Sequence, residues 1–266
     1  MYEERPALLD GAVLWTRTAG PATDAVRPVL PDGCMDLIWA DGHLLVAGPD
    51  TRAYVPGEFA ARYAGIRFAP GDAPGFFGVP AHELRDRRVA LGALWGEAEA
   101  RRLGERIGEA PDPAAALDDL VRLRAAGAPA PDPLLRAVVA RLAAGRAVAE
   151  TADAVGIGAR QLHRRSLDAF GYGPKTLARV LRLQRALALV LAGVPYAEAA
   201  VRAGCVDQAH LARETRALAG MTLGAYVASV ASVASAEPEA SVAAAAEWAA
   251  SANSETPEPS GSRTTA

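Results

Sequence analysis

Apolar and polar residues alternate in short runs over the first 95 residues, which is the spacing of β-strands. Turn sequences rich in Gly, Asp and Pro separate the apolar runs at 12–15, 34–40, 43–48 and 63–70. The pair Asp41-Gly42 tolerates positive φ and predicts a tight hairpin. Several short strands in one segment predict a β-rich domain over residues 1–95, built as a small sandwich or barrel.

The apolar spacing becomes helical after this segment. Leu103 and Ile107 fall on one helix face, and Leu117, Leu120 and Val121 follow the same period in the next segment. The sequence PDP places a proline where a helix can begin, at 111–113 and again at 131–133. We therefore predict connecting helices and a linker over 96–130, an all-α domain over 131–230, and a disordered tail over 231–266, which is rich in Ala, Ser and Pro.

Two segments of the helical region, 151–171 and 199–220, resemble each other. Each has an alanine four residues before a glycine, in the pairs Ala152–Gly156 and Ala200–Gly204. A small residue at a helix contact, followed by a turn that needs positive φ, is typical of a helix-turn-helix. An αα-corner without a nucleic-acid partner is the alternative for a single unit, but the repeat favours two DNA-binding units.

A long helix is predicted between the two units, from about residue 175 to residue 192. At the α-helical rise it would be about 27 Å long. Successive major-groove faces of B-DNA lie about 34 Å apart. A rod of this length could hold two recognition helices in neighbouring grooves of one duplex.

The outward faces of the two predicted recognition helices follow from their inward leucines, Leu162 and Leu211. A turn of about 100° per residue places the following residues outward in the first helix: Arg160, His163, Arg164 and Leu167. The same rule gives, in the second helix, Gln208, Ala209, Ala212, Arg213 and Arg216. Arginine, glutamine and histidine can bond base edges or phosphates.

Positive charge is concentrated in this same region. Residues 131–230 hold 13 Lys and Arg against 7 Asp and Glu, a net charge of +6, whereas the rest of the chain holds 15 against 24, a net charge of −9. Such a split suggests a polyanion as the partner, with a solvated arginine-rich face as an equal alternative. Together with the repeat of the helix-turn-helix pattern, it predicts double-stranded DNA as the partner. Lys175 and Arg179 are expected to contact phosphates near the recognition helices.

Other site chemistries find little support. Cys34 and Cys205 are far apart, and His43 and His82 have no companions at metal-ligand spacing, so no metal site is predicted. The sequence has no glycine-rich phosphate loop and no nucleophile elbow, so neither a cofactor nor a catalytic site is predicted. It has no apolar run of about 18 residues and no secretory signal, so we expect no membrane partner and a cytoplasmic protein.

Arg67 has two interpretations on the sequence alone. It could hold an acidic ligand inside a barrel, or it could face solvent or pair with a carboxylate on an alternating strand. Cys34 is expected to be a buried small hydrophobe, and Asp32 is expected to stabilise a turn.

The joint pattern over 131–230 resembles the DNA-binding domain of the AraC/XylS transcription regulators. The residues that carry this resemblance are Leu162, Arg164, Phe170, Gly171, Pro174, Arg182, Arg185 and Ala186, then Ala200, Gly204, Gln208, Leu211 and Arg213. The resemblance implies two helix-turn-helix units on a linker helix. It also implies base-reading positions at Arg160, His163, Arg164, Gln208, Ala209 and Arg213. Ser166, Cys205 and Leu223 depart from the family, which usually has Phe, an aromatic residue and Pro at these positions.

Residues 30–39, 47–49 and 65–71 are similar to the front domain of some actinobacterial members of this family. The similarity implies a β-rich effector or dimerisation domain, for which a cupin-like fold is one candidate. The predicted fold class is thus α+β and multidomain, and the predicted function is a sequence-specific transcription regulator. A small-molecule effector, RNA polymerase and a second copy of the chain are further candidate partners. The alternatives are a ligand-sensing protein-interaction module and a small β-domain enzyme with secondary DNA binding.

Overall fold

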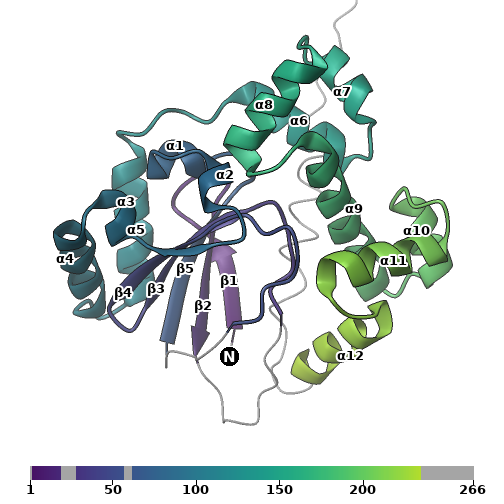
Figure 1. The fold of residues 1–266 in the computed structure, drawn as a ribbon. Helices are drawn as coiled ribbons and strands as arrows, with labels where there is room; N and C mark the ends of the chain where they lie inside the picture. Colours follow the sequence, from purple (N-terminus) through teal and green to yellow (C-terminus); the bar gives the residue numbers. More distant parts are fainter. Residues whose placement is uncertain (1, 19–27, 57–61, 235–266) are drawn as a thin grey trace, which may run out of the picture.

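The N-terminal part of the chain folds into one antiparallel sheet. The computed structural model describes residues 2–18, 28–56 and 62–234. Six strands lie in the order β1-β2-β5-β3-β4-β6 (Figure 1). They are β1 (Tyr2–Pro6), β2 (Val13–Thr18), β3 (Met35–Ala40), β4 (His43–Ala47), β5 (Arg62–Phe68) and β6 (Arg88–Ala90). The predicted hairpin is confirmed, because Asp41 and Gly42 join β3 to β4 with φ of 44° and 91°.

Helices bury one face of this sheet. They are α1 (Ala73–Phe77), α2 (Ala81–Leu84), α3 (Gly92–Trp95), α4 (Glu97–Gly108) and α5 (Pro113–Ala125). Leu37, Ile66 and Phe68 alternate along their strands onto this face and form one core with Ile107 of α4 and Leu117 of α5. The segment predicted to be a connection thus supplies helices that share the core of the sheet.

The expectation of a sandwich or barrel is wrong for the described residues. They form a single open sheet, whereas a sandwich or a cupin-like fold pairs two sheets. The physical reason is the cover that α4 and α5 provide. The Trp39 indole Nε1 donates to the Gly104 carbonyl oxygen of α4 at 3.1 Å, so helices take the place that a second sheet would fill.

The opposite face of the sheet carries a buried polar cluster. Trp15 lies over Gly65 of the neighbouring strand, where a Cβ would stand 2.2 Å from the indole. The Trp15 Nε1 donates to Asp36 Oδ1 at 2.7 Å. Arg67 pairs with Glu4 at 3.1 Å and with Asp32 and Asp36 at 3.5 Å, so the carboxylate-paired interpretation of Arg67 holds. Burial raises the pKa of Asp36 to about 6, although Arg67 opposes the shift.

The C-terminal part is helical and has two small cores. Its helices are α6 (Pro133–Ala143), α7 (Val148–Ala154), α8 (Ala159–Phe170), α9 (Pro174–Leu191), α10 (Tyr196–Arg202), α11 (Gln208–Ala219) and α12 (Leu223–Ala234). Leu177 and Val180 of α9 pack into the first core, and Leu183 and Leu187 pack into the second. The predicted fold class is therefore confirmed: a β-sheet domain is followed by helices that contain two helix-turn-helix units on a linker helix.

The last described helix extends into the predicted tail. Residues 231–234 form the end of α12, and the remainder of the predicted tail, 235–266, lies outside the described residues. Within the described ranges, no helix is long and apolar enough to cross a membrane.

Candidate nucleic-acid interface

The first helix-turn-helix consists of α7 and α8. Gly156 has a φ of 70° in the turn, as the sequence predicts, and the Ile157 amide donates to the Ala152 carbonyl oxygen at 3.1 Å. Ala152 is buried at the helix contact, and Leu162 on the inner side of α8 is fully buried. The inner side of α8 is thereby fixed against α7 and α9.

The second unit, α10 and α11, repeats this geometry. Gly204 has a φ of 86°, and the Cys205 amide donates to the Ala200 carbonyl oxygen at 2.8 Å. This hydrogen bond corresponds to the Ile157–Ala152 bond, with both residues displaced by 48 positions. Asp207 caps α11 by accepting from the His210 amide at 2.6 Å. The internal repeat seen in the sequence is therefore also a structural repeat.

The outer faces of α8 and α11 are exposed. In the first unit the exposed residues are Arg160, His163 and Arg164, and in the second they are Gln208, Ala209 and Arg213. Among the described residues, Arg160, Arg164 and Arg213 form no ion pair with a carboxylate (the salt bridges of the region lie elsewhere). These charges are therefore available to an external anion.

Lys175 is exposed at the start of α9. A cation in the first turn of a helix opposes the helix dipole, so this position is unfavourable for a lysine without an anion nearby. Across the described ranges Lys175 forms no salt bridge. Its placement beside the end of α8 suits contact with a backbone phosphate.

Arg179 has a different environment. Its Nε and Nη2 donate to the two carboxylate oxygens of Glu214 on α11, at 2.9 Å and 3.1 Å. Arg182 adds a third contact to the same carboxylate at 3.3 Å. These hydrogen bonds lower the pKa of Glu214 and raise the pKa of Arg179. The ion pair fixes α11 to the linker helix.

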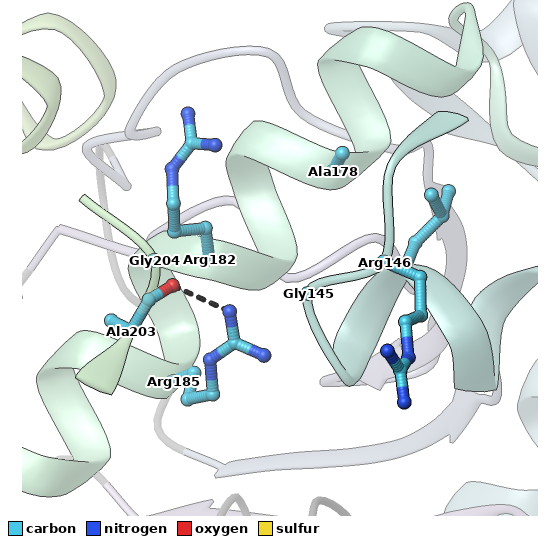
Figure 2. Close-up of a pocket in the computed structure, with 8 residues that line it drawn as sticks. Gly145, Arg146, Ala178, Arg182, Arg185, Ala203 and Gly204 are labelled. Carbon is cyan, nitrogen blue, oxygen red and sulfur yellow. Dashed lines mark hydrogen bonds between the residues drawn. The ribbon is translucent and has the colours of Figure 1, made fainter. Parts of the chain in front are cut away.

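Arg185 connects α6 to the second unit through backbone groups. Its Nη1 donates to the carbonyl oxygen of Ala143 at the end of α6. Its Nη2 donates to the carbonyl oxygen of Ala203, directly after α10, as Figure 2 shows. One guanidinium thus holds the C-terminal end of α6, which precedes the first unit, and the C-terminal end of α10 in the second unit. Sequence reasoning assigned Arg185 to the family pattern without this role, because carbonyl partners leave no mark in the sequence.

The sheet domain contacts the C-terminal ends of both recognition helices, which the sequence did not predict. Arg85, directly after α2, donates at 3.1 Å to the carbonyl oxygen of Gly171, directly after α8. The Ala53 amide donates to the Leu218 carbonyl oxygen near the end of α11 at 2.6 Å. Figure 1 shows α1 and α2 directly beside α8.

The described residues do not provide the ligand set of a metal site. Within the described ranges, no group of three His, Cys, Asp or Glu residues is arranged to hold a metal ion. Cys34 is half-buried directly before β3, and its amide donates to Asp32 Oδ1 at 2.8 Å. Asp32 thus stabilises a turn, as predicted.

Comparison with known proteins gives two domain matches. A family model described as a helix-turn-helix domain matches residues 151–229, and a model described as a domain of unknown function matches residues 12–90. The comparison with curated proteins gives no significant match.

Solved structures of ToxT from Vibrio cholerae are weakly similar to most of the chain. One, at 1.65 Å resolution, has a TM-score of 0.43 and 7% identity and covers 82% of this chain and 97% of its own. A variant of apo ToxT from the same organism has a TM-score of 0.43 and 9% identity, with the same coverage.

Proposed function

Because residues 151–229 form a helix-turn-helix domain of the AraC type, we propose that this protein is a sequence-specific transcription regulator that binds duplex DNA through two adjacent major grooves. The observation that carries this proposal is the structural repeat. Two units with the same turn hydrogen bond are fixed to one 18-residue helix, and each exposes arginine on its second helix. The linker spans about 27 Å, close to the repeat of the major groove.

Base recognition is assigned to the exposed residues of α8 and α11. In this proposal Arg160, His163 and Arg164 face base edges in one groove, and Gln208, Ala209 and Arg213 face them in the next. Arginine can form two hydrogen bonds with guanine, and glutamine can form two with adenine. The Ala209 methyl can make an apolar contact with the methyl group of thymine. These pairings make the complex depend on sequence.

Phosphate contacts are assigned to Lys175 and Arg179. Lys175 is exposed, and a phosphate beside it would offset the unfavourable interaction of the lysine charge with the helix dipole. The Nε and Nη2 atoms of Arg179 donate to Glu214, so its Nη1 remains as the donor for a phosphate. Contacts of this kind orient the protein on the duplex without reading its sequence.

We further propose that the sheet domain modulates DNA binding, through a small-molecule effector or through pairing with a second copy of the chain. The contacts of Arg85 with Gly171 and of Ala53 with Leu218 support such coupling, because they reach both recognition helices. In this role the protein is no enzyme; it acts on DNA in the cytoplasm, where RNA polymerase is a further candidate partner.

The decisive experiment is selection of bound fragments from the genomic DNA of its source, followed by gel shifts. We expect selective retardation of the recovered fragments that weakens steeply with salt. The double variant Arg164→Ala, Arg213→Ala should lose selectivity, whereas Arg122→Ala, an exposed arginine of α5, should bind as wild type does. Recovery of no common sequence, or equal retardation of random DNA, would refute the proposal and leave a protein-interaction module.

A further inference from the structure

A small pocket lies between the two helix-turn-helix units, on the linker helix. Gly145 and Arg146 line it from the loop between α6 and α7, Arg182 and Arg185 from α9, and Ala203 and Gly204 from the turn between α10 and α11 (Figure 2). Three arginines from two segments, the α6–α7 loop and α9, thus line one opening. Arginine side chains with planar, bidentate donors are the common protein ligands of phosphate.

The surroundings of the pocket carry more positive than negative charge. Of five arginines in this region, four share two carboxylates: Arg141 and Arg146 pair with Glu150, and Arg179 and Arg182 pair with Glu214. The fifth, Arg185, forms no ion pair with any described residue and donates to carbonyl oxygens instead. Three positive charges are therefore left without an internal counterion in this part of the chain.

The arrangement around Arg185 suits an external anion. Arg185 has a lowered pKa, because it is partly desolvated and lies close to the positive charge of Arg182. The Nε atoms of Arg182 and Arg185 are buried and meet no acceptor among the described residues. A negative group in the pocket would offset the repulsion between these two guanidinium groups.

Two glycines keep the opening free beside Arg185. A Cβ on Gly145 would stand 2.9 Å from Arg185 Nη2, and a Cβ on Gly204 would stand 3.5 Å from the same atom. Both glycines have positive φ, 81° and 86°, so other residues would also be strained there. Because both turns have glycine at these positions, no side chain from either position blocks the approach to the Arg185 guanidinium.

The position of the pocket matches the path of a DNA strand between two grooves. Arg146 lies two residues before the first helix of unit one, and Gly204 lies four residues before α11, the recognition helix of unit two. In helix-turn-helix complexes the first helix crosses the sugar-phosphate backbone. A duplex that spans both units therefore passes its backbone by this part of the surface.

We propose that this pocket binds a single phosphodiester of the DNA backbone between the two major grooves. Arg146 and Arg182 are its ligands, and Arg185 lines the pocket and adds positive charge. The proposal rests on DNA binding through both units. It adds a fixed central anchor to the contacts at the recognition helices. Such an anchor would set the register of the two units along the duplex.

The test combines arginine substitutions with single neutral methylphosphonates placed in turn along the central part of a selected duplex. In the wild-type full-length protein, one central position should weaken binding on neutralisation. The same change should have no further effect in Arg146→Ala or in Arg182→Gln. Each variant should also lose about 0.9 of the slope of log K against log salt, which is the value for one phosphate.

Arg146→Ala is the main variant, because this side chain is 61% exposed and its removal leaves the core intact. Arg122→Ala serves as the control and should keep the wild-type methylphosphonate profile and salt slope. If the wild-type protein binds its duplex selectively but no central position couples to Arg146 or Arg182, the pocket proposal is overturned and the proposed function stands. If the wild-type protein shows no selective binding, both are overturned.

Discussion

Glu214 of α11 accepts two hydrogen bonds from Arg179 of α9, at 2.9 Å and 3.1 Å, so one carboxylate connects the second recognition helix to the linker helix. Arg182 shares this carboxylate one helical turn further along. The angle of α11 relative to α9 therefore depends on an ion pair as well as on apolar packing. Since α9 also forms part of the first core, the ion pair contributes to the spacing of the two units.

Substitution of Glu214 by Gln should lower the free energy of unfolding by about 1 kcal/mol at neutral pH, as for other half-exposed ion pairs. The pKa of Glu214 is lowered in the folded state, so its stabilisation is present above the ordinary pKa of a glutamate and is lost as the pH falls through the lowered value. Urea unfolding at several pH values measures this. The difference between wild type and variant should shrink in acid, and a constant difference would contradict the role given to the charge.

Arg164→Ala should cost on the order of 1–3 kcal/mol of binding free energy and relax specificity at one base pair, because its side chain is exposed on the base-reading face of α8. Titration of the variant against duplexes that differ at single positions measures both effects. A loss spread evenly over all sequences would show that Arg164 contacts the backbone instead.

Lys175→Ala should weaken binding to selected and random DNA by the same factor and reduce the salt slope by about one unit. The reason is that a lysine in the first turn of α9 offers a point charge to a phosphate and no geometry for a base edge. Binding constants over a range of salt concentrations give the slope. A changed sequence preference would contradict the phosphate assignment.

The helix-turn-helix repeat could be predicted from the sequence because its determinants are local. Ala152 and Gly156 lie four residues apart and recur as Ala200 and Gly204, and the inward leucine of each recognition helix fixes which side is exposed. The matching turn hydrogen bonds, displaced by 48 residues, follow from this local pattern. Periodicity therefore suffices where one helix and its turn determine the geometry.

Long-range contacts could not be predicted in the same way. Arg185 reaches the Ala143 carbonyl oxygen across 42 positions, and Glu214 lies 35 positions from Arg179. Any arginine can donate to any exposed carbonyl, so residue type alone does not identify the partner. The barrel prediction failed for a related reason: strand spacing does not show whether a second sheet or a pair of helices covers the apolar face.

Asp36 should make stability depend on pH in the direction opposite to Glu214. Its pKa is raised to about 6, so the folded state keeps a proton that the unfolded chain releases, and stability falls as the pH rises through this window. Asp36→Asn should remove most of this dependence, since an amide oxygen can still accept from the Trp15 indole. Urea unfolding of wild type and variant, at pH values between the ordinary aspartate pKa and neutrality, measures this loss of pH dependence. Asp119→Asn, on the exposed face of α5, is the control and should keep the wild-type dependence of stability on pH.

The buried hydroxyl of Ser166 should be dispensable for stability. Ser166 is fully buried in the inner side of α8, where its Oγ meets no partner among the described residues. Ser166→Ala removes a desolvated group without a hydrogen bond and should raise the free energy of unfolding by about 1 kcal/mol.

Thr215 provides the matched comparison for this prediction. It lies in the corresponding place of α11 and is equally buried, but its Oγ1 donates to the Leu211 carbonyl oxygen at 2.8 Å. Thr215→Val keeps the shape and removes that hydrogen bond, so it should lower the free energy of unfolding by about 1 kcal/mol. Thermal and urea unfolding of the two variants should therefore shift in opposite directions from wild type. If Ser166→Ala also destabilised the protein, the Ser166 hydroxyl would have to form a stabilising contact in solution.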